Sequence, residues 1–180
     1  MTTWGKWKAL HPSTTVYVKQ SIDYKSRFKQ ESFAYVAKTE EGPVRPDDLI
    51  VGIEGHLEAR AYLLRRLAKQ RLTLDVLEST PILVYLTPDS STTRVYRREV
   101  DGRELHLELG AEERLRDSET GSVWDPLSGV ALEGEMEGKA LQPLVSTYAV
   151  WFAWRKYRPD TVVVGEPSAP KADDKRRALR

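Results

Sequence analysis

The sequence around Trp124 contains three carboxylates and a hydroxyl, residue types that can bind ligands or take part in catalysis. They are Asp117, Glu119, Ser122 and Asp125. Carboxylates beside an aromatic ring can bind a cation or act as acid and base. The simpler interpretation is structural, with polar side chains bonding the backbone of their own turn while Trp124 fills the core. We favour the structural interpretation and keep the segment as the best candidate site, because loops held on a sheet often carry function.

A second polar group follows one face of a predicted strand. Glu58, Arg60 and Tyr62 alternate with apolar residues, and His56 lies in register with them. An arginine in such a stripe could bind a carboxylate or phosphate through two parallel hydrogen bonds. A solvated sheet face with a Glu–Arg pair gives the same pattern and is the commoner case. Arg60 and Tyr62 are therefore the second candidate for ligand binding.

Other chemistries find little support in the sequence. The chain has no cysteine, which excludes thiol catalysis, disulfides and Cys-ligated metals. The three histidines, His11, His56 and His106, are far apart and show no ligand spacing. There is no glycine-rich phosphate loop and no nucleophile elbow. We expect no metal or other cofactor and no catalytic residue.

The elements that must position these side chains are mostly strands. Short apolar or alternating runs bounded by turn residues predict β-structure, and one basic amphipathic run predicts a short helix. The predicted strands are Leu49–Ile53, Leu57–Tyr62, Leu72–Val76 and the more apolar Ile82–Leu86, and the predicted helix is Leu63–Gln70.

A hairpin is predicted around Asp101-Gly102, because both residue types tolerate the positive φ angles of a type I′ turn. Its strands are Thr92–Val100 and Arg103–Leu109, the second of which alternates buried leucines with polar residues. The turn-rich stretch 118–138 leaves room for short strands at Ser122–Trp124 and Val130–Leu132. The predicted fold class is α+β, with a mainly antiparallel, curved or barrel-like sheet and tryptophan-bearing helices near both ends.

The two ends of the chain repeat one pattern. Trp4, Trp7, Pro12, Thr14 and Val16 recur, each 147 positions later, as Trp151, Trp154, Pro159, Thr161 and Val163. Tryptophans three apart share a helix face, the proline ends the helix, and the β-branched residues predict a strand. The usual role of such tryptophans is core packing. If the first helix has no neighbour, Trp4, Trp7 and Leu10 are exposed and form a candidate partner surface, for instance in a homodimer.

Charge and length bound the remaining classes. The chain has 180 residues and a net charge of +1, and its last ten residues hold five basic and two acidic side chains. The rest of the chain has no positive excess, so a nucleic-acid partner is not expected. No apolar run is long enough to span a membrane and no export signal is visible, which predicts a cytoplasmic protein. We divide the chain into a linker-like helix and strand (1–20), one β-rich domain (21–165) and a disordered tail (166–180).

Six segments follow one another in a characteristic order: Val51–Ile53, Glu58–Tyr62, Val100–Leu105, Leu115–Trp124, Gly129–Leu141 and Trp151–Thr161. Together they resemble the prokaryotic family known as domain of unknown function 3179. The resemblance implies that longer members contain two such domains. It also implies that this chain corresponds to the second domain, preceded by the helix that closes the first. An upstream sister domain is then the alternative partner to a second copy.

One departure from the family bears on activity. First domains of the family carry a Tyr-Cys-Pro-type segment after a central strand, where this chain has Val84–Pro88 without cysteine. The resemblance thus implies that a cysteine-dependent activity is missing. We expect a non-catalytic structural or protein-interaction domain, the degenerate half of a duplicated architecture. The alternative is a small-ligand, cation-binding or hydrolytic domain that uses the Asp117–Asp125 turn with Arg60 and Tyr62.

Overall fold

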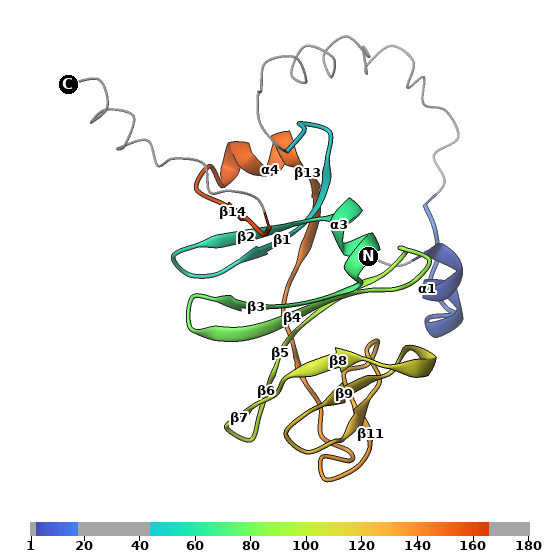
Figure 1. Cartoon of the computed structure of the whole chain (residues 1–180). Coiled ribbons are helices and arrows are strands. Elements are labelled where there is room, and N and C mark those ends of the chain that lie inside the picture. Colours follow the sequence, from blue (N-terminus) through green and yellow to red (C-terminus); the bar gives the residue numbers. More distant parts are fainter. Residues whose placement is uncertain (1–2, 18–43, 166–180) are drawn as a thin grey trace, which may run out of the picture.

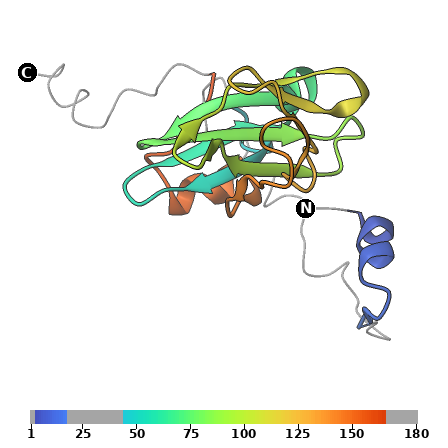
Figure 2. The same cartoon turned by 90° about the horizontal axis from the view of Figure 1, so that it is seen from below.

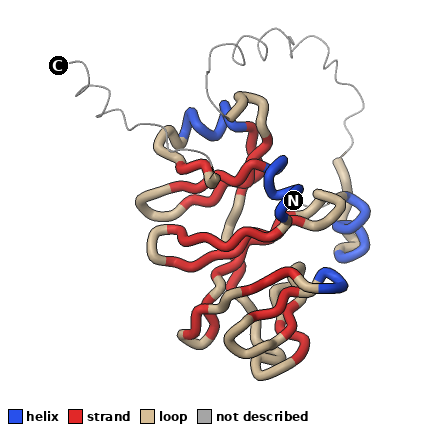
Figure 3. Tube along the Cα trace, in the orientation of Figure 1, coloured by secondary structure: helices blue, strands red, loops and turns tan. Residues whose placement is uncertain are grey.

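The structure is a computed structural model that describes residues 3–17 and 44–165. Strands dominate these residues, as the red segments of Figure 3 show, and helices are few and short. The helices are α1 (Trp4–Leu10), α3 (Leu64–Gln70) and α4 (Trp151–Tyr157), with a 3-10 turn, η2 (Ala111–Glu113). The predicted tail 166–180 and residues 18–20 of the predicted linker lie outside the described residues.

In the described residues, the β-structure consists of three four-stranded sheets and one short hairpin. The first sheet has the order β13 (Thr147–Val150), β1 (Leu49–Glu54), β2 (Ala59–Leu63), β14 (Val162–Val163). The second has the order β12 (Gln142–Pro143), β5 (Thr93–Arg97), β4 (Thr80–Leu86), β3 (Leu72–Leu77). The third has the order β11 (Ala131–Glu133), β10 (Val123–Trp124), β9 (Leu115–Asp117), β8 (Leu107–Leu109). Within residues 3–17 and 44–165, all strand pairs are antiparallel except β14 with β2. The α+β class is confirmed, but the sheets do not close into a barrel.

The layers are stacked, with the second sheet between the first and the third (Figure 1). The central strand β4 explains this stacking, because its side chains alternate between two hydrophobic cores. Ile82, Val84 and Leu86 belong to the core shared with the first sheet, whereas Leu83 and Tyr85 belong to the core shared with the third. This two-sided burial agrees with the apolar run that the sequence shows at this strand.

A third core lies on the other face of the first sheet, where α4 packs (Figure 2). It contains Trp151 and Trp154 together with small residues of β2, Ala59 and Ala61. Gly52 in β1 lies directly under the second indole. A Cβ added there would come within 2.7 Å or less of three atoms of the Trp154 ring. The missing side chain is therefore what allows the helix to approach the strand.

The Asp101-Gly102 turn forms as predicted, but the hairpin is much shorter than predicted. Asp101 and Gly102 have φ angles of 51° and 76°, as a type I′ turn requires. Only β6 (Glu99–Val100) and β7 (Arg103–Glu104) pair across it. The pairing changes at Arg98, because its backbone N–H donates to the Pro81 carbonyl, next to β4, whereas its carbonyl accepts the N–H of Leu105. The chain then continues into β8, which joins the third sheet rather than pairing with β5.

The two repeated ends behave differently. After α4, the predicted strand forms as β14 and pairs with β2. After α1, residues 14–17 form no strand. A strand needs a neighbour for its backbone hydrogen bonds, and the described residues give the first copy none.

Candidate functional site

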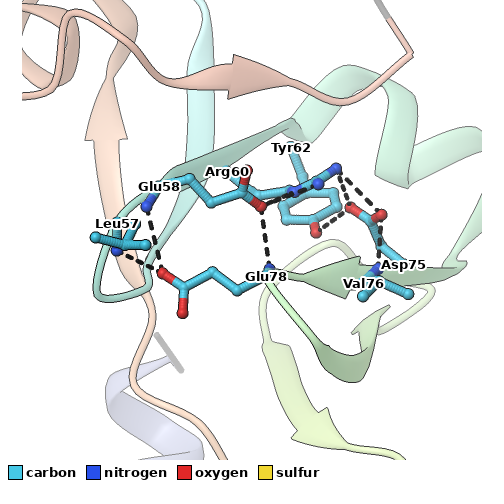
Figure 4. Close-up of polar contacts among 7 residues, drawn as sticks. All are labelled: Leu57, Glu58, Arg60, Tyr62, Asp75, Val76 and Glu78. Carbon is cyan, nitrogen blue, oxygen red and sulfur yellow. Dashed lines mark hydrogen bonds and ion pairs between the residues drawn. The ribbon is translucent and has the colours of Figure 1, made fainter.

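Figure 4 shows a polar group at the edge between the first and second sheets, here called the inter-sheet cluster. Its members are Glu58, Arg60 and Tyr62 from the β2 side and Asp75 and Glu78 from the β3 side. The Arg60 guanidinium donates to Asp75 at 3.2 and 3.3 Å and to Glu58 at 3.0 and 3.1 Å. The Tyr62 hydroxyl donates to Asp75 at 2.7 Å. All three nitrogens of Arg60 are thus used within the protein.

Glu78 extends the inter-sheet cluster to the adjoining turns. Its carboxylate accepts the backbone N–H groups of Leu57 and Glu58 at 2.5 and 3.3 Å. In return, the backbone N–H of Glu78 donates to the Glu58 carboxylate at 3.1 Å. These reciprocal bonds connect the β1–β2 turn to the β3–β4 turn, so the cluster joins two sheets at two points.

The electrostatics of the cluster follow from these contacts. Burial, reinforced by the hydrogen bond to Asp75, raises the pKa of Tyr62, so its phenol remains protonated. The backbone N–H of Glu78, with Arg60 in support, lowers the pKa of Glu58. At neutral pH the cluster therefore contains a charged guanidinium between carboxylates and a neutral phenol that only donates.

Around Trp124 the candidate residues divide into a buried and an outward set. The buried set is Asp117, Ser122 and Trp124, each at most 1% exposed. The Asp117 carboxylate accepts the indole N–H of Trp124 at 2.8 Å and both the backbone N–H and the hydroxyl of Thr120 at 2.6–2.9 Å. Ser122 bonds to the Thr120 hydroxyl at 2.7 Å and accepts the backbone N–H of Met136 at 3.0 Å. Buried polar groups with this many partners hold a turn in place.

Glu119 and Asp125 form the outward set and have separate partners. Glu119 accepts the backbone N–H of His106 and bonds its ring Nδ1, both at 2.8 Å. Although partial burial acts in the opposite direction, these bonds from His106 lower the pKa of Glu119 to about 2. Asp125 accepts the Ser128 hydroxyl at 2.8 Å and contacts Arg114 at 3.3 Å. The predicted group of carboxylates is thus dispersed over several local contacts.

The two candidate groups lie on different sheets. Arg60 and Tyr62 belong to β2, whereas Asp117 and Trp124 belong to β9 and β10. The sheet of β3, β4 and β5 lies between them (Figure 1). The hydrogen bonds of each group, as given above, stay on its own side. The structure therefore brings Arg60 and Tyr62 together, and Asp117, Ser122 and Trp124 together, but not one set with the other.

The histidines lie in three separate settings. The ring of His11 contacts that of Trp7, with centroids 4.2 Å apart, and His106 contacts Glu119. His56 lies in the β1–β2 turn, beside a small hollow of about 140 Å³ that Glu58 and Arg158 also line. Within residues 3–17 and 44–165, no three His, Asp or Glu side chains are grouped so that they could hold a metal ion.

Sequence reasoning missed the partners that complete the inter-sheet cluster. Asp75 is the one charged residue in the run Leu72–Leu77, and a lone carboxylate inside such a strand was an available signal. Glu78 has a φ angle of 58°, which a sequence does not show. A further trio was also missed, in which Arg71 bonds to Glu113 at 2.6 Å and to the Tyr85 hydroxyl at 3.2 Å.

The predicted partner surface is exposed on α1. Trp4 and Trp7 are 51% and 43% exposed, whereas their counterparts Trp151 and Trp154 are 6% and 7% exposed. The side chain of Leu10, the third predicted member, lies outside the described part of the chain. Exposed indoles at this spacing are consistent with a surface that another domain covers.

Two comparisons with known proteins gave no match, and one identifies the family. No curated protein and no solved structure is similar to the chain at a significant level. None of the helices in residues 3–17 and 44–165 is long and apolar enough to cross a membrane. The model of a family described as protein of unknown function (DUF3179) matches residues 1–161. Since that match spans most of the sequence, the chain belongs to the DUF3179 family.

Proposed function

We propose that this chain is a non-catalytic structural or protein-interaction domain, the degenerate half of a duplicated architecture. The observation that carries the proposal is the burial of Asp117, which lies in strand β9 of the third sheet. Its carboxylate is 1% exposed and receives donors from Thr120 and Trp124. A catalytic or ligand-binding carboxylate needs access to its substrate, and this one has its hydrogen bonds satisfied inside the fold.

The inter-sheet cluster supports the same conclusion. Arg60 would have to leave both Glu58 and Asp75 to bind an anion, and two partly buried carboxylates would lose their counter-charge. The cluster instead suits a role in holding the first and second sheets together. The ligand-binding or hydrolytic alternative would require Arg60 and the Trp124 turn to meet, and a whole sheet lies between them.

A melting experiment tests the proposal. The full chain would be titrated with divalent metals and with a library of small carboxylates, phosphates and sugars while its melting temperature is followed. A ligand that binds the folded state raises the melting temperature by mass action. We expect no specific shift. A shift of several degrees that Arg60→Gln or Asp117→Asn abolishes would contradict a non-catalytic role.

A further inference from the structure

The two tryptophan helices make the same local hydrogen bonds, which a shared sequence pattern alone does not require. The indole N–H of Trp7 donates to the Thr14 hydroxyl at 3.1 Å. The indole N–H of Trp154 donates to the Thr161 hydroxyl at 2.8 Å. Each pair is seven residues apart, and each threonine follows the proline that ends its helix.

The backbone bonds at the ends of the two helices match as well. The His11 N–H bonds to the Trp7 carbonyl and the Thr14 N–H to the His11 carbonyl. At the second helix, the Arg158 N–H bonds to Trp154 and the Thr161 N–H to Arg158. Every one of these atoms is displaced by the same 147 positions. The helix, its end and the orientation of the second indole are therefore one structural unit that occurs twice.

The docked copy shows what such a unit binds. Trp154 lies over Gly52 in β1, and Ala59 and Ala61 of the neighbouring strand belong to the same core. Next to them, β14 continues the unit as a parallel strand beside β2. The receptor is thus a sheet face with a glycine under the second indole, small side chains beside it, and a free strand edge.

The first copy carries the same pair of indoles, but no sheet face among the described residues covers them. Trp4 and Trp7 are about half exposed. The segment after Pro12, which corresponds to β14, forms no strand in residues 14–17. Both features that the second unit uses, the indole pair and the pairing strand, are unused in the first.

We propose that α1 is the closing helix of a sister domain, and that it docks over a glycine in a sheet face of the kind that β1 and β2 present to α4. This inference rests on the duplicated architecture proposed above and names its contact. A second copy of this chain is not the partner, because α4 already fills the matching face over Gly52.

A helix graft within the full chain tests whether α1 can close such a sheet. The graft gives residues 151–161 the sequence of residues 4–14 and leaves both tryptophans, the proline and the threonine in place. It consists of Phe152→Gly, Ala153→Lys, Arg155→Lys, Lys156→Ala, Tyr157→Leu, Arg158→His and Asp160→Ser. A smaller graft keeps Phe152 and Ala153. The matched control is each graft with Trp154→Ala added.

We expect both grafts to melt cooperatively, with a melting temperature roughly 5–10 °C below that of the native chain. Adding Trp154→Ala to either graft should lower its melting temperature by roughly a further 10 °C, because the indole over Gly52 is lost. Loss of cooperative melting in the full graft overturns the proposal. If the smaller graft still folds, the residues that correspond to Gly5 and Lys6 prevent docking, and if it does not, the rest of the helix prevents it. A Trp154→Ala change without effect in the grafts also overturns it.

Light scattering of the intact chain separates the sister domain from a homodimer. We expect a monomer over the micromolar range. A dimer that Trp7→Ala dissociates would overturn the sister-domain assignment, because a second copy would then cover α1. Neither this result nor the graft depends on whether a small ligand shifts the melting temperature, so failure of this inference can be told apart from failure of the proposed function.

Discussion

At the scale of single residues, the polar side chains that looked most reactive are satisfied by their neighbours. Asp117 accepts three donor groups through two oxygens, and Arg60 donates from all of its nitrogens. In both places residue type alone suggested chemistry, and burial and hydrogen bonds show a structural role. The distinction depends on which partners come close in space. Arg60 finds Asp75 on another strand, and Asp117 finds Thr120 and Trp124 within its own turn region.

Asp117→Asn should destabilise the domain by about 1–3 kcal/mol, because an amide cannot accept donors at both positions and leaves a buried donor unpaired. Urea denaturation measures this change. Asp125→Asn is the matched control, since Asp125 is partly exposed and bonds to its own turn. It should cost less than about 0.5 kcal/mol. Equal losses in the two variants would argue against the buried network as the reason for the Asp117 effect.

The lowered pKa of Glu119 predicts how the stability of the domain depends on pH. Its pKa is about 2 in the folded protein and is raised toward its ordinary value of 4.5 on unfolding. Between these values the unfolded chain binds more protons, so lowering the pH through this window removes stability that is fully present above it. Glu119→Gln should make the denaturation midpoint fall less steeply between pH 4.5 and pH 2. Parallel profiles for the variant and the parent protein would show that the bonds from His106 do not hold in solution.

At the scale of elements, the inter-sheet cluster joins β2 to β3 across two sheets that have no backbone ladder between them. Strands within a sheet are held by repeated backbone bonds, whereas sheets are joined by side chains. Here the hydrophobic core containing Tyr62 and Ile82 is bordered by the Arg60–Asp75 pair. The pair therefore fixes how the two sheets meet.

A double-mutant cycle with Arg60→Gln and Asp75→Asn should reveal this coupling. Each single change should cost about 1–2 kcal/mol, and the two should be non-additive by at least about 0.5 kcal/mol because the side chains share bonds. The comparison cycle uses Arg103 and Glu135, an exposed pair 2.9 Å apart. Exposed pairs are typically worth less than about 1 kcal/mol. Additive losses at Arg60 and Asp75 would mean that the cluster does not join the sheets.

At the scale of the whole molecule, the sequence predicted elements better than their arrangement. Periodicity and turn chemistry gave the strands β1, β3 and β4, the helix α3 and the Asp101-Gly102 turn, because these depend on neighbouring residues. The division into three sheets was not predictable in this way. It depends on the change of pairing partner at Arg98 and on β12 and β13 returning to separate sheets.

The candidate site shows the same limit. The stripe Glu58, Arg60 and Tyr62 was visible as an alternation, but its partners on β3 were not. The repeat of the tryptophan helix is visible at both ends, but the sequence does not show that Gly52 lies under Trp154, whose ring is buried whereas that of Trp7 is exposed. Long-range contacts of this kind leave no local pattern.

The most direct test of the account compares the two equivalent tryptophans in the intact chain. Trp154→Ala should lower the free energy of unfolding by about 3–5 kcal/mol, because it empties the space over Gly52. Trp7→Ala should lower it by less than about 0.5 kcal/mol, because α1 closes no sheet within the described chain. Chemical denaturation, followed by circular dichroism rather than tryptophan fluorescence, measures both. Similar losses in the two variants would contradict the claim that one repeated helix is docked and the other awaits a partner domain.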